Sequence, residues 1–313
     1  VVLAGLAIFT SGAVIAALAP AFWMVLAGRG VMAVGGGLVT PVAASIAAGL
    51  AAPADRGRAL ATVFGGLTLA QVLGVPAGAW LGYAVGWQAA FWAVAVLGLI
   101  VTLALSRLIP RGISVPGASL AALGQVLASP LHLGAVAFGV LFLSGIYCVY
   151  TFIGALLETR LGLERDGIST MLLIFGIGAV AGNWIGGRMT DRIGATRTLA
   201  ALCAAQIVLL PAVSLSAMAF VPMALLMGVW SVCGWSFMAP QQARLSALDP
   251  ARTTTLFALN ASAIYLAASV GTLAGGMVLH ATGSYGSLGI AGAAFIALAA
   301  LSLAVVGRMA PRG

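Results

Sequence analysis

Charged residues are scarce in this sequence: it has no lysine, six acidic residues and only 6% charged positions in 313 residues. A soluble globular domain carries about 25% charged residues, so this chain lacks the polar surface that water requires. Hydrophobic residues instead make up 62% of the chain, and the mean hydropathy is +1.16. The composition therefore excludes an ordinary soluble domain and predicts an integral membrane protein.

Residues that could carry enzymatic, metal or cofactor chemistry are equally rare. The three cysteines (Cys148, Cys203 and Cys233) lie in apolar stretches without metal-ligand spacing, so we expect neither a metal site nor redox chemistry. Both histidines, His132 and His280, lie near the ends of apolar runs, where we expect them at the membrane interface. No motif for a soluble cofactor is present. Because every acidic residue falls in a predicted loop or at a helix end, a membrane enzyme, which needs convergent acid and base groups, is disfavoured.

Long apolar runs dominate what remains. A helix needs about 20 apolar residues to cross a hydrocarbon core of about 30 Å. Runs of that order recur along the whole chain and predict about ten transmembrane helices, and hence an all-α membrane protein. The predicted helices lie near residues 1–19, 22–48, 59–85, 88–107, 131–156, 168–187, 198–218, 221–243, 255–280 and 287–307.

The fourteen arginines fall mainly in every second gap between these runs. Positive residues in short loops are retained in the cytoplasm, so this pattern places those gaps and both ends of the chain inside. The net charge of +8 therefore reflects membrane topology, and we expect no nucleic-acid partner. The arginines on this side are Arg56, Arg58, Arg107, Arg111, Arg188, Arg192, Arg197, Arg244, Arg252, Arg308 and Arg312.

An internal repeat divides the chain at an offset of about 197 residues. Gly74 and Gly78 match Gly271 and Gly275 at this offset, so the helices that contain them are predicted to be equivalent. Residues 108–129 are rich in proline and glycine and predict a cytoplasmic linker. The expected divisions are 1–107 with four helices, the linker 108–129, and 130–313 with six helices. Equal halves would require about 66 further residues with two helices before Val1, so we expect a truncated twelve-helix protein.

The gap after the run 168–187 carries a distinctive motif of Gly, Asp, Arg, Gly and Arg. The sequence here resembles the major facilitator superfamily, whose members have a G-x-x-x-D-R-x-G-x-x-R type loop in each half. By this resemblance the loop is cytoplasmic and helps gate the transporter. A close helix contact at the first glycine, a tight turn at the second and an ion pair of the acid with arginines are expected. The alternative is a merely basic loop. The candidate gating residues are Gly187, Arg188, Asp191, Arg192, Gly194 and Arg197.

A second motif combines glycines with a proline inside the run 59–85. Gly74, Pro76, Gly78 and Gly82 resemble the antiporter signature in the fifth helix of drug and metabolite efflux proteins of the superfamily. Proline removes a backbone hydrogen bond and predicts a bend, while the glycines permit close helix approach. The matching family branch is that of drug–proton antiporters, which includes arabinose-type and chloramphenicol-type efflux permeases.

Arg29 is a charge within the run 22–48, followed by glycines. A charge inside a membrane costs about 3 kcal/mol on insertion scales and marks a functional site by default. It resembles the fourth-helix arginine of the superfamily, which implies a role in proton transfer. The alternative is that its side chain reaches the outer interface.

Other polar and aromatic residues inside the predicted helices are candidates for a substrate cavity. Each of them alternatively serves helix packing, and the aromatic residues near 230–238 alternatively face lipid or the core. The cavity candidates are Gln71, Tyr147, Tyr150, Thr151, Trp230, Trp235, Asn260 and Tyr265.

Together, the resemblance predicts a secondary transporter in a bacterial inner membrane. It would export small apolar or amphipathic compounds in exchange for protons, by alternating access between two helix bundles. The proton gradient would supply the energy, without a cofactor, and the expected partners are the substrate, protons and the lipid bilayer, with the protein a monomer. The alternatives are a proton- or sodium-coupled importer of the same fold and a truncated remnant that does not transport.

Overall fold

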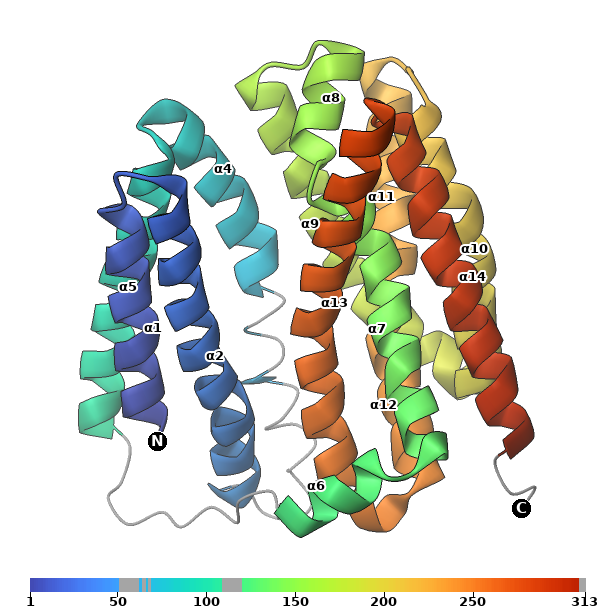
Figure 1. Cartoon of the computed structure of the whole chain (residues 1–313). Coiled ribbons are helices and arrows are strands. Elements are labelled where there is room, and N and C mark those ends of the chain that lie inside the picture. Colours follow the sequence, from blue (N-terminus) through green and yellow to red (C-terminus); the bar gives the residue numbers. More distant parts are fainter. Residues whose placement is uncertain (51–61, 64–65, 67–68, 109–119, 310–313) are drawn as a thin grey trace. The chain divides into compact units, whose positions relative to one another are not determined.

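The computed structural model describes residues 1–50, 62–63, 66, 69–108 and 120–309. Two compact units make up the chain, unit 1 (Val1–Gly117) and unit 2 (Ala118–Gly313), and each is considered by itself. The described residues are helical almost throughout and contain no strand (Figure 1). The predicted all-α class is therefore confirmed.

Unit 1 is built around its first helix, α1, which packs against both α2 and α5. The helix α4 also contacts α5 and is preceded by a π-helical turn, η2. The elements are α1 (Val2–Ala17), α2 (Phe22–Leu50), η2 (Ala70–Gly74), α4 (Val75–Ala84) and α5 (Trp87–Leu108). Part of the predicted run 59–85 lies outside the described residues.

Glycines bring α1 and α2 into backbone contact. A Cβ on Gly12 would lie 2.6 Å from the backbone nitrogen of Met32, and one on Gly28 would lie 2.7 Å from that of Ala16. No real Cβ tolerates such a distance, so larger residues would force the helices apart. Membrane helices lack a hydrophobic force between them and depend on this kind of close packing. The α1–α2 pair is thus fixed by its glycines.

Unit 2 has α7 at its centre, in contact with α13 and α14, while α14 packs on α10 and α9 packs on α11. The short helices α6 and α8 lie at opposite ends of the unit (Figure 1). The elements are α6 (Leu120–Leu127), α7 (Pro130–Tyr150), α8 (Ile153–Leu161), α9 (Arg165–Ile193), α10 (Ala195–Leu215), α11 (Phe220–Trp235), α12 (Met238–Leu248), η3 (Pro250–Arg252), α13 (Thr253–Thr282) and α14 (Gly286–Met309).

Two of the predicted helices in unit 2 are interrupted and longer than expected. The run 131–156 becomes α7 and α8, and the run 221–243 becomes α11 and α12. At the second break Pro240 has no N–H to donate to the carbonyl of Ser236, four residues earlier. That carbonyl lies directly against Gly186 of α9, where any side chain would collide with it. The break therefore combines a missing hydrogen bond with close helix packing.

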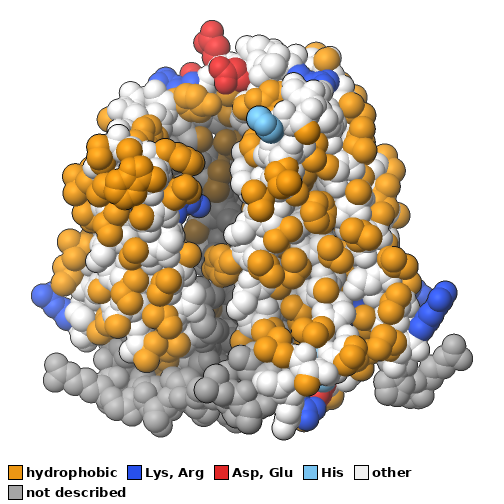
Figure 2. All heavy atoms as spheres, in the orientation of Figure 1, with side chains coloured by type: hydrophobic (Ala, Val, Ile, Leu, Met, Phe, Trp, Pro, Cys, Tyr) orange, Lys and Arg blue, Asp and Glu red, His pale blue; other side chains and the backbone are white. Residues whose placement is uncertain are grey.

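The surface of the described helices suits a lipid environment. Among the described residues, eight segments are long and apolar enough to cross a membrane, and Val2–Ala17 is a shorter apolar helix. Hydrophobic side chains dominate the visible face of each unit in Figure 2, and most charged side chains lie near helix ends. Exposed examples in unit 2 include Val208, Leu225, Met277 and Leu301. The prediction of a multi-pass membrane protein is confirmed.

The predicted linker 108–129 contains structure that the sequence did not suggest. Its residues 109–119 lie outside the described part, but Leu120–Leu127 forms α6. Val126 of this helix is fully buried against α7, α12, α13 and α14, in a cluster with Ala135, Leu245, Leu256 and Val306. The last part of the interval thus belongs to the core of unit 2.

Candidate functional site

Three helices of unit 2 enclose a small polar cluster. The side-chain amide of Gln241 on α12 donates to the backbone carbonyl of Ala135 on α7 (2.8 Å) and to Oδ1 of Asn260 on α13 (3.3 Å). Gly139 leaves room for these groups, because a Cβ there would lie 3.1 Å from Asn260 Oδ1. Asn260, a predicted cavity residue, is only 3% exposed and bonded to Gln241. It therefore joins α12 to α13 within the interior.

Arg244 lies one helical turn beyond Gln241 and is the most unusual residue of the cluster. It is 8% exposed, and neither Nη1 nor Nη2 has a hydrogen-bond partner among the described residues. Its guanidinium carbon lies 5.5 Å from the centre of the Phe138 ring. The sequence placed Arg244 in a loop, which is wrong because α12 continues to Leu248.

Burying the charge of Arg244 costs more free energy than its aromatic contact returns. A buried charge deprived of its partner costs about 3–5 kcal/mol. A desolvated cation over an aromatic ring recovers about 2 kcal/mol. The contact with Phe138 therefore offsets only part of the cost, and an acceptor is missing. Gln241 Oε1 is a second buried polar atom without a partner in this part of the chain.

Several predicted cavity residues meet in an aromatic cluster of unit 2. The Tyr150 ring lies 4.7 Å from that of Phe175 and 6.2 Å from that of Tyr147, centre to centre. Phe175 in turn contacts Trp230 at 4.9 Å. Tyr147 and Tyr150 are partly exposed, but Trp230 is fully buried. Trp230 therefore supports the tyrosines from behind instead of lining an open cavity in this conformation.

The remaining cavity candidates are distributed differently. Thr151, at the break between α7 and α8, is exposed and lies 2.8 Å from Thr272, oxygen to oxygen. Tyr265 on α13 is 52% exposed, whereas Trp235 is half-buried at the end of α11. Gln71 lies in η2, and its side chain is outside the described part. The structure thus brings Tyr147, Tyr150 and Thr151 together and separates the buried Asn260 from them.

The glycine–proline motif of unit 1 coincides with a change of helix type. The π-helical turn ends at Gly74, and α4 begins at Val75 with Pro76 in its first turn. Prolines and π-turns are the usual causes of a sharp helix bend, and the bend at Pro76 itself stays a prediction. A Cβ on Gly74 or Gly78 meets no atom within 4 Å, and one on Gly82 only the Trp87 Cα at 4.0 Å. The expected close contact at Gly74 and Gly78 is therefore absent from the described structure.

The repeat-related glycines in unit 2 behave in the opposite way. A Cβ on Gly271 would lie 2.9 Å from the Cβ of Tyr147, and one on Gly275 would lie 2.7 Å from the carbonyl oxygen of Cys148. Both glycines thus allow α13 to pack closely on α7. Among the described residues, the glycines of this predicted repeat pack closely in unit 2 and not in unit 1.

Arg29 points away from the glycine interface of unit 1. Its neighbour Gly28 lies against α1, and Arg29 itself is exposed. No described residue forms a hydrogen bond or ion pair with Arg29. The role of Arg29 in proton transfer stays a prediction.

The gating motif is mostly helical instead of forming a loop. Helix α9 continues to Ile193, and only Gly194, with φ of +84°, separates it from α10. Arg188 stacks on Trp184 at 3.8 Å, and Asp191, Arg192 and Arg197 are exposed without an ion pair among the described residues. The expected turn at Gly194 is present.

The glycine contact of this motif is displaced by one residue. A Cβ on Gly187 would meet nothing within 4 Å, whereas Gly186 lies against the Ser236 backbone. Within the described residues the close contact belongs to Gly186, and a close contact at Gly187 stays a prediction.

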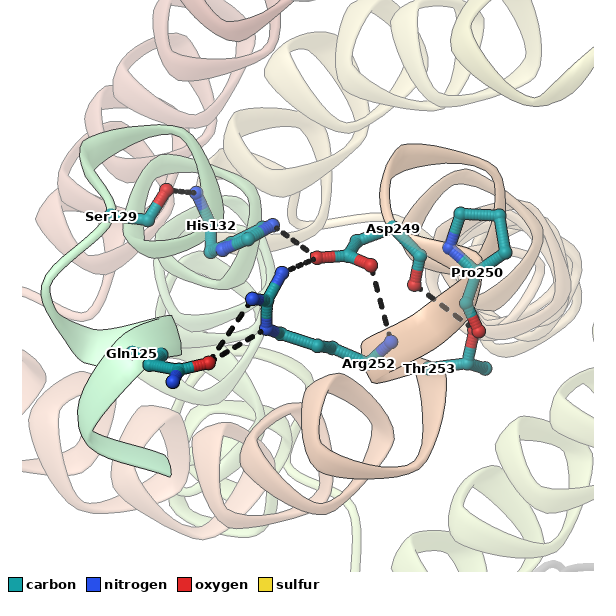
Figure 3. A network of polar contacts seen from close by, with 7 residues as sticks. All are labelled: Gln125, Ser129, His132, Asp249, Pro250, Arg252 and Thr253. Atoms are coloured by element: carbon teal, nitrogen blue, oxygen red, sulfur yellow. Dashed lines mark hydrogen bonds and ion pairs between the residues drawn. The ribbon is translucent and has the colours of Figure 1, made fainter. Parts of the chain in front are cut away.

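A polar network at the α6 end of unit 2 was not anticipated (Figure 3). Asp249 Oδ2 lies 2.7 Å from Arg252 Nη1 and 3.4 Å from His132 Nε2. Arg252 also donates to Oε1 of Gln125 on α6, at 3.3 and 3.1 Å. The hydrogen bond from Arg252 lowers the pKa of Asp249. His132 is 7% exposed and lies in the first turn of α7, and its position at the membrane interface stays a prediction.

This network joins segments that are distant in sequence. Ser129 caps α7, and Asp249 caps η3 by accepting from the Arg252 backbone at 3.2 Å. The Asp249–Pro250 pair is a recognisable start signal for a helical turn. Nothing in the sequence indicates the pairing with His132, because that contact depends on how α7 packs beside the turn.

Comparisons with known proteins agree with this architecture. The family model for the Major Facilitator Superfamily matches residues 1–272. An uncharacterised MFS-type transporter of Bacillus subtilis (strain 168), YbcL, is 32% identical over 278 residues, which cover 88% of this chain and 70% of that protein. A chloramphenicol resistance protein of Streptomyces lividans is 36% identical over 193 residues, covering 59% of this chain and 48% of that protein.

Solved structures show the same fold at lower identity. A bacterial homologue of the human lysosomal transporter Spinster, in an inward-facing and unoccupied conformation, has a TM-score of 0.70 at 17% identity. The match covers 98% of this chain and 82% of that one. The Escherichia coli fucose:proton symporter FucP has a TM-score of 0.66 at 13% identity, covering 97% and 83%. The chain belongs to the major facilitator superfamily.

Proposed function

We propose that this chain exports small apolar or amphipathic compounds in exchange for protons, by alternating access. The observation that carries the proposal is the antiporter-type motif, in which Pro76 and the flanking glycines follow a π-helical turn. The likeness to a chloramphenicol resistance protein supports export. The proton gradient supplies the energy, and no cofactor takes part.

The described residues suggest a division of roles. The partly exposed Tyr147 and Tyr150, with the exposed Thr151, form a face that offers aromatic rings and hydroxyl groups to a substrate. Arg29 is unpaired in unit 1 and is our candidate proton relay. The segment from Gly187 to Arg197 contributes to gating at the cytoplasmic ends of α9 and α10. These roles need no metal and no partner protein, and we propose a monomer.

The proposed orientation follows from the arginines. In unit 2, Arg188, Arg192, Arg197 and Arg252 lie in or beside the turns that follow α9 and α12. Positive residues favour the cytoplasmic side, which places the α6 end of unit 2 inside a bacterial inner membrane. Both ends of the chain are then cytoplasmic.

Import on the same fold is the second candidate function. It is favoured by the structural likeness to FucP, which is described as a fucose:proton symporter. The sequence likeness to a resistance protein and the motif at Pro76 favour export. A remnant without transport activity is the third outcome that an experiment has to distinguish.

The decisive experiment compares two prolines in membrane helices. Pro76 lies in the antiporter-type motif, whereas Pro211 lies inside α10 without such glycines. We expect Pro76→Leu to reduce export of chloramphenicol from cells by at least about tenfold, equivalent to about 1.4 kcal/mol, and Pro211→Leu to reduce it much less. Equal export by Pro76→Leu and the parent would contradict the proposal. Inward accumulation by the parent would establish import of chloramphenicol, whereas no flux of chloramphenicol or of any other tested apolar or amphipathic compound in either direction would favour the remnant.

A further inference from the structure

Arg244 is a buried cation whose hydrogen-bonding groups are unused. The residue is 8% exposed, and its two terminal nitrogens find no acceptor in the described structure. A planar guanidinium offers several N–H donors in a fork that matches a carboxylate or a phosphate. A group of this kind, fixed among helices, is therefore prepared to receive an oxyanion.

The two terminal nitrogens of Arg244 are shielded from water in this conformation. Helix α12 begins at Met238 in the interior and ends at Leu248, beside the α6 end. Helical side chains lean toward the start of their own helix, which here is the interior. Arg244 accordingly lies beside Phe138, one turn deeper along α7 than Ala135, which Gln241 contacts. The charge is directed into the unit, not toward its edge.

No described acidic residue of unit 2 pairs with Arg244. Asp249 is held by Arg252 and His132. Glu158, Glu164 and Asp166 lie around the start of α9, at the opposite end of the unit. Asp191 is at the same end as Arg244 but is exposed. The missing acceptor is therefore not supplied by these carboxylates in this conformation.

The surroundings of Arg244 are aromatic on one side and polar on the other. Phe138 stacks on Phe142, and Phe142 on Phe237, with ring centres 5.7 and 5.2 Å apart. Gln241, one turn away on the same helix, keeps a free carbonyl oxygen, an acceptor that can pair with a donor group of the ligand but not with its anionic head. Such an arrangement matches a molecule with an apolar or aromatic body and one negatively charged head.

We propose that Arg244 binds the carboxylate or phosphate head of the transported molecule, so that amphipathic organic anions are substrates. This inference rests on the proposed transport function and narrows its substrate class. The guanidinium is closed off in this conformation, so the ligand enters when α12 shifts. Helix α12 is separated from α11 by a break, and the proposed movement is confined to α12.

Binding is tested on the purified protein in detergent by thermal unfolding, which needs no transport. The probes are benzoate and phenyl phosphate, with benzamide as the uncharged counterpart of benzoate and inorganic phosphate as the head group alone. We expect the two aromatic anions to raise the melting temperature saturably, and benzamide and inorganic phosphate to have much smaller effects. The anion that raises the melting temperature more shows whether the site prefers a carboxylate or a phosphate head group.

Variants assign the effect to this residue. Arg244→Gln should weaken benzoate or phenyl phosphate binding by at least about tenfold, and Arg244→Lys by less, because lysine keeps the charge but loses the fork. Arg308→Gln, at an exposed arginine near the end of α14, is the matched control and should bind normally. Without ligand, Arg244→Met should be at least as stable as the parent, because it removes an unpaired buried charge.

Several results would overturn the proposal. The first is that the aromatic anions raise the melting temperature of Arg244→Gln as much as that of the parent. The second is that neither aromatic anion raises the melting temperature of the parent. The third is that inorganic phosphate raises it as much as the aromatic anions do. A strong loss of stability in Arg244→Met, together with non-additive effects of Arg244→Gln and Asp191→Asn, would show that Asp191 is the partner in another conformation. Anion binding together with no efflux of benzoate, phenyl phosphate or chloramphenicol from cells would instead refute the proposed function and leave the site intact.

Discussion

The Cβ position of Gly271 on α13 lies 2.9 Å from the Cβ of Tyr147 on α7. At the repeat-related Gly74, an added Cβ would have no other atom within 4 Å among the described residues. Two glycines that occupy equivalent places in the sequence therefore meet different surroundings. Because Tyr147 belongs to the proposed substrate face, the contact at Gly271 also fixes the helix that carries this face.

This contrast predicts opposite effects of alanine at the two glycines. Alanine is favoured over glycine in a helix by about 1 kcal/mol, so Gly74→Ala should be neutral or stabilising. Gly271→Ala should destabilise unit 2 by about 1–3 kcal/mol, because the added methyl group collides with the backbone of Ser144. Thermal unfolding of the two purified variants checks this. Equal stability of Gly271→Ala and the parent would show that α13 is not held this closely.

The motif around Gly194 offers a second matched comparison. Gly194 has φ of +84° and ψ of 156°, a region that is essentially restricted to glycine. We expect Gly194→Ala to cost about 1–3 kcal/mol of stability, and Gly187→Ala, which meets open space, to cost nothing. Denaturation of both variants in detergent measures the difference. If Gly187→Ala were the more harmful, the close contact would belong to Gly187, as its sequence position first suggested.

Hydropathy was sufficient to predict the helices but not the residues that they enclose. The runs 131–156 and 221–243 are real, yet their breaks were missed because the sequence remains apolar through them. Arg244 was assigned to a loop by its charge, although Gln241 and Arg244 share one face of a continuing helix. For helices that are apolar on all sides, periodicity does not reveal which face is buried. This is why the fully buried Trp230 and the exposed Tyr265 were both predicted to line a substrate cavity.

The Asp249 network predicts a specific pH dependence. Its hydrogen bond from Arg252 lowers the pKa of Asp249 in the folded protein. A lowered pKa contributes stability above the unfolded-state value of about 3.9, and that stability is lost as the pH falls through the folded-state pKa. Asp249→Asn should therefore be less stable than the parent near pH 7, by about 1–3 kcal/mol, and approach it at acidic pH.

A matched control for this prediction is Asp166, whose side chain is 82% exposed and pairs with Arg165. Exposed ion pairs contribute about 0–1 kcal/mol, so Asp166→Asn should change little at any pH. Unfolding temperatures of the parent and both variants between about pH 3 and pH 7 make the comparison. A constant difference for Asp249→Asn across this range would mean that the carboxylate acts by its shape and hydrogen bonds, not by its charge.

Arg29 yields a prediction about transport instead of stability. Its side chain is exposed and unpaired among the described residues. We therefore expect Arg29→Gln to change the free energy of unfolding by less than about 0.5 kcal/mol. If Arg29 relays protons, the same variant should lose at least about tenfold in export driven by a pH gradient in proteoliposomes, while exchange of labelled for unlabelled substrate without a gradient persists. Arg308→Gln serves as the control for a change of net charge. Loss of exchange as well as of driven export would assign Arg29 to substrate binding, because proton coupling alone is not needed for exchange.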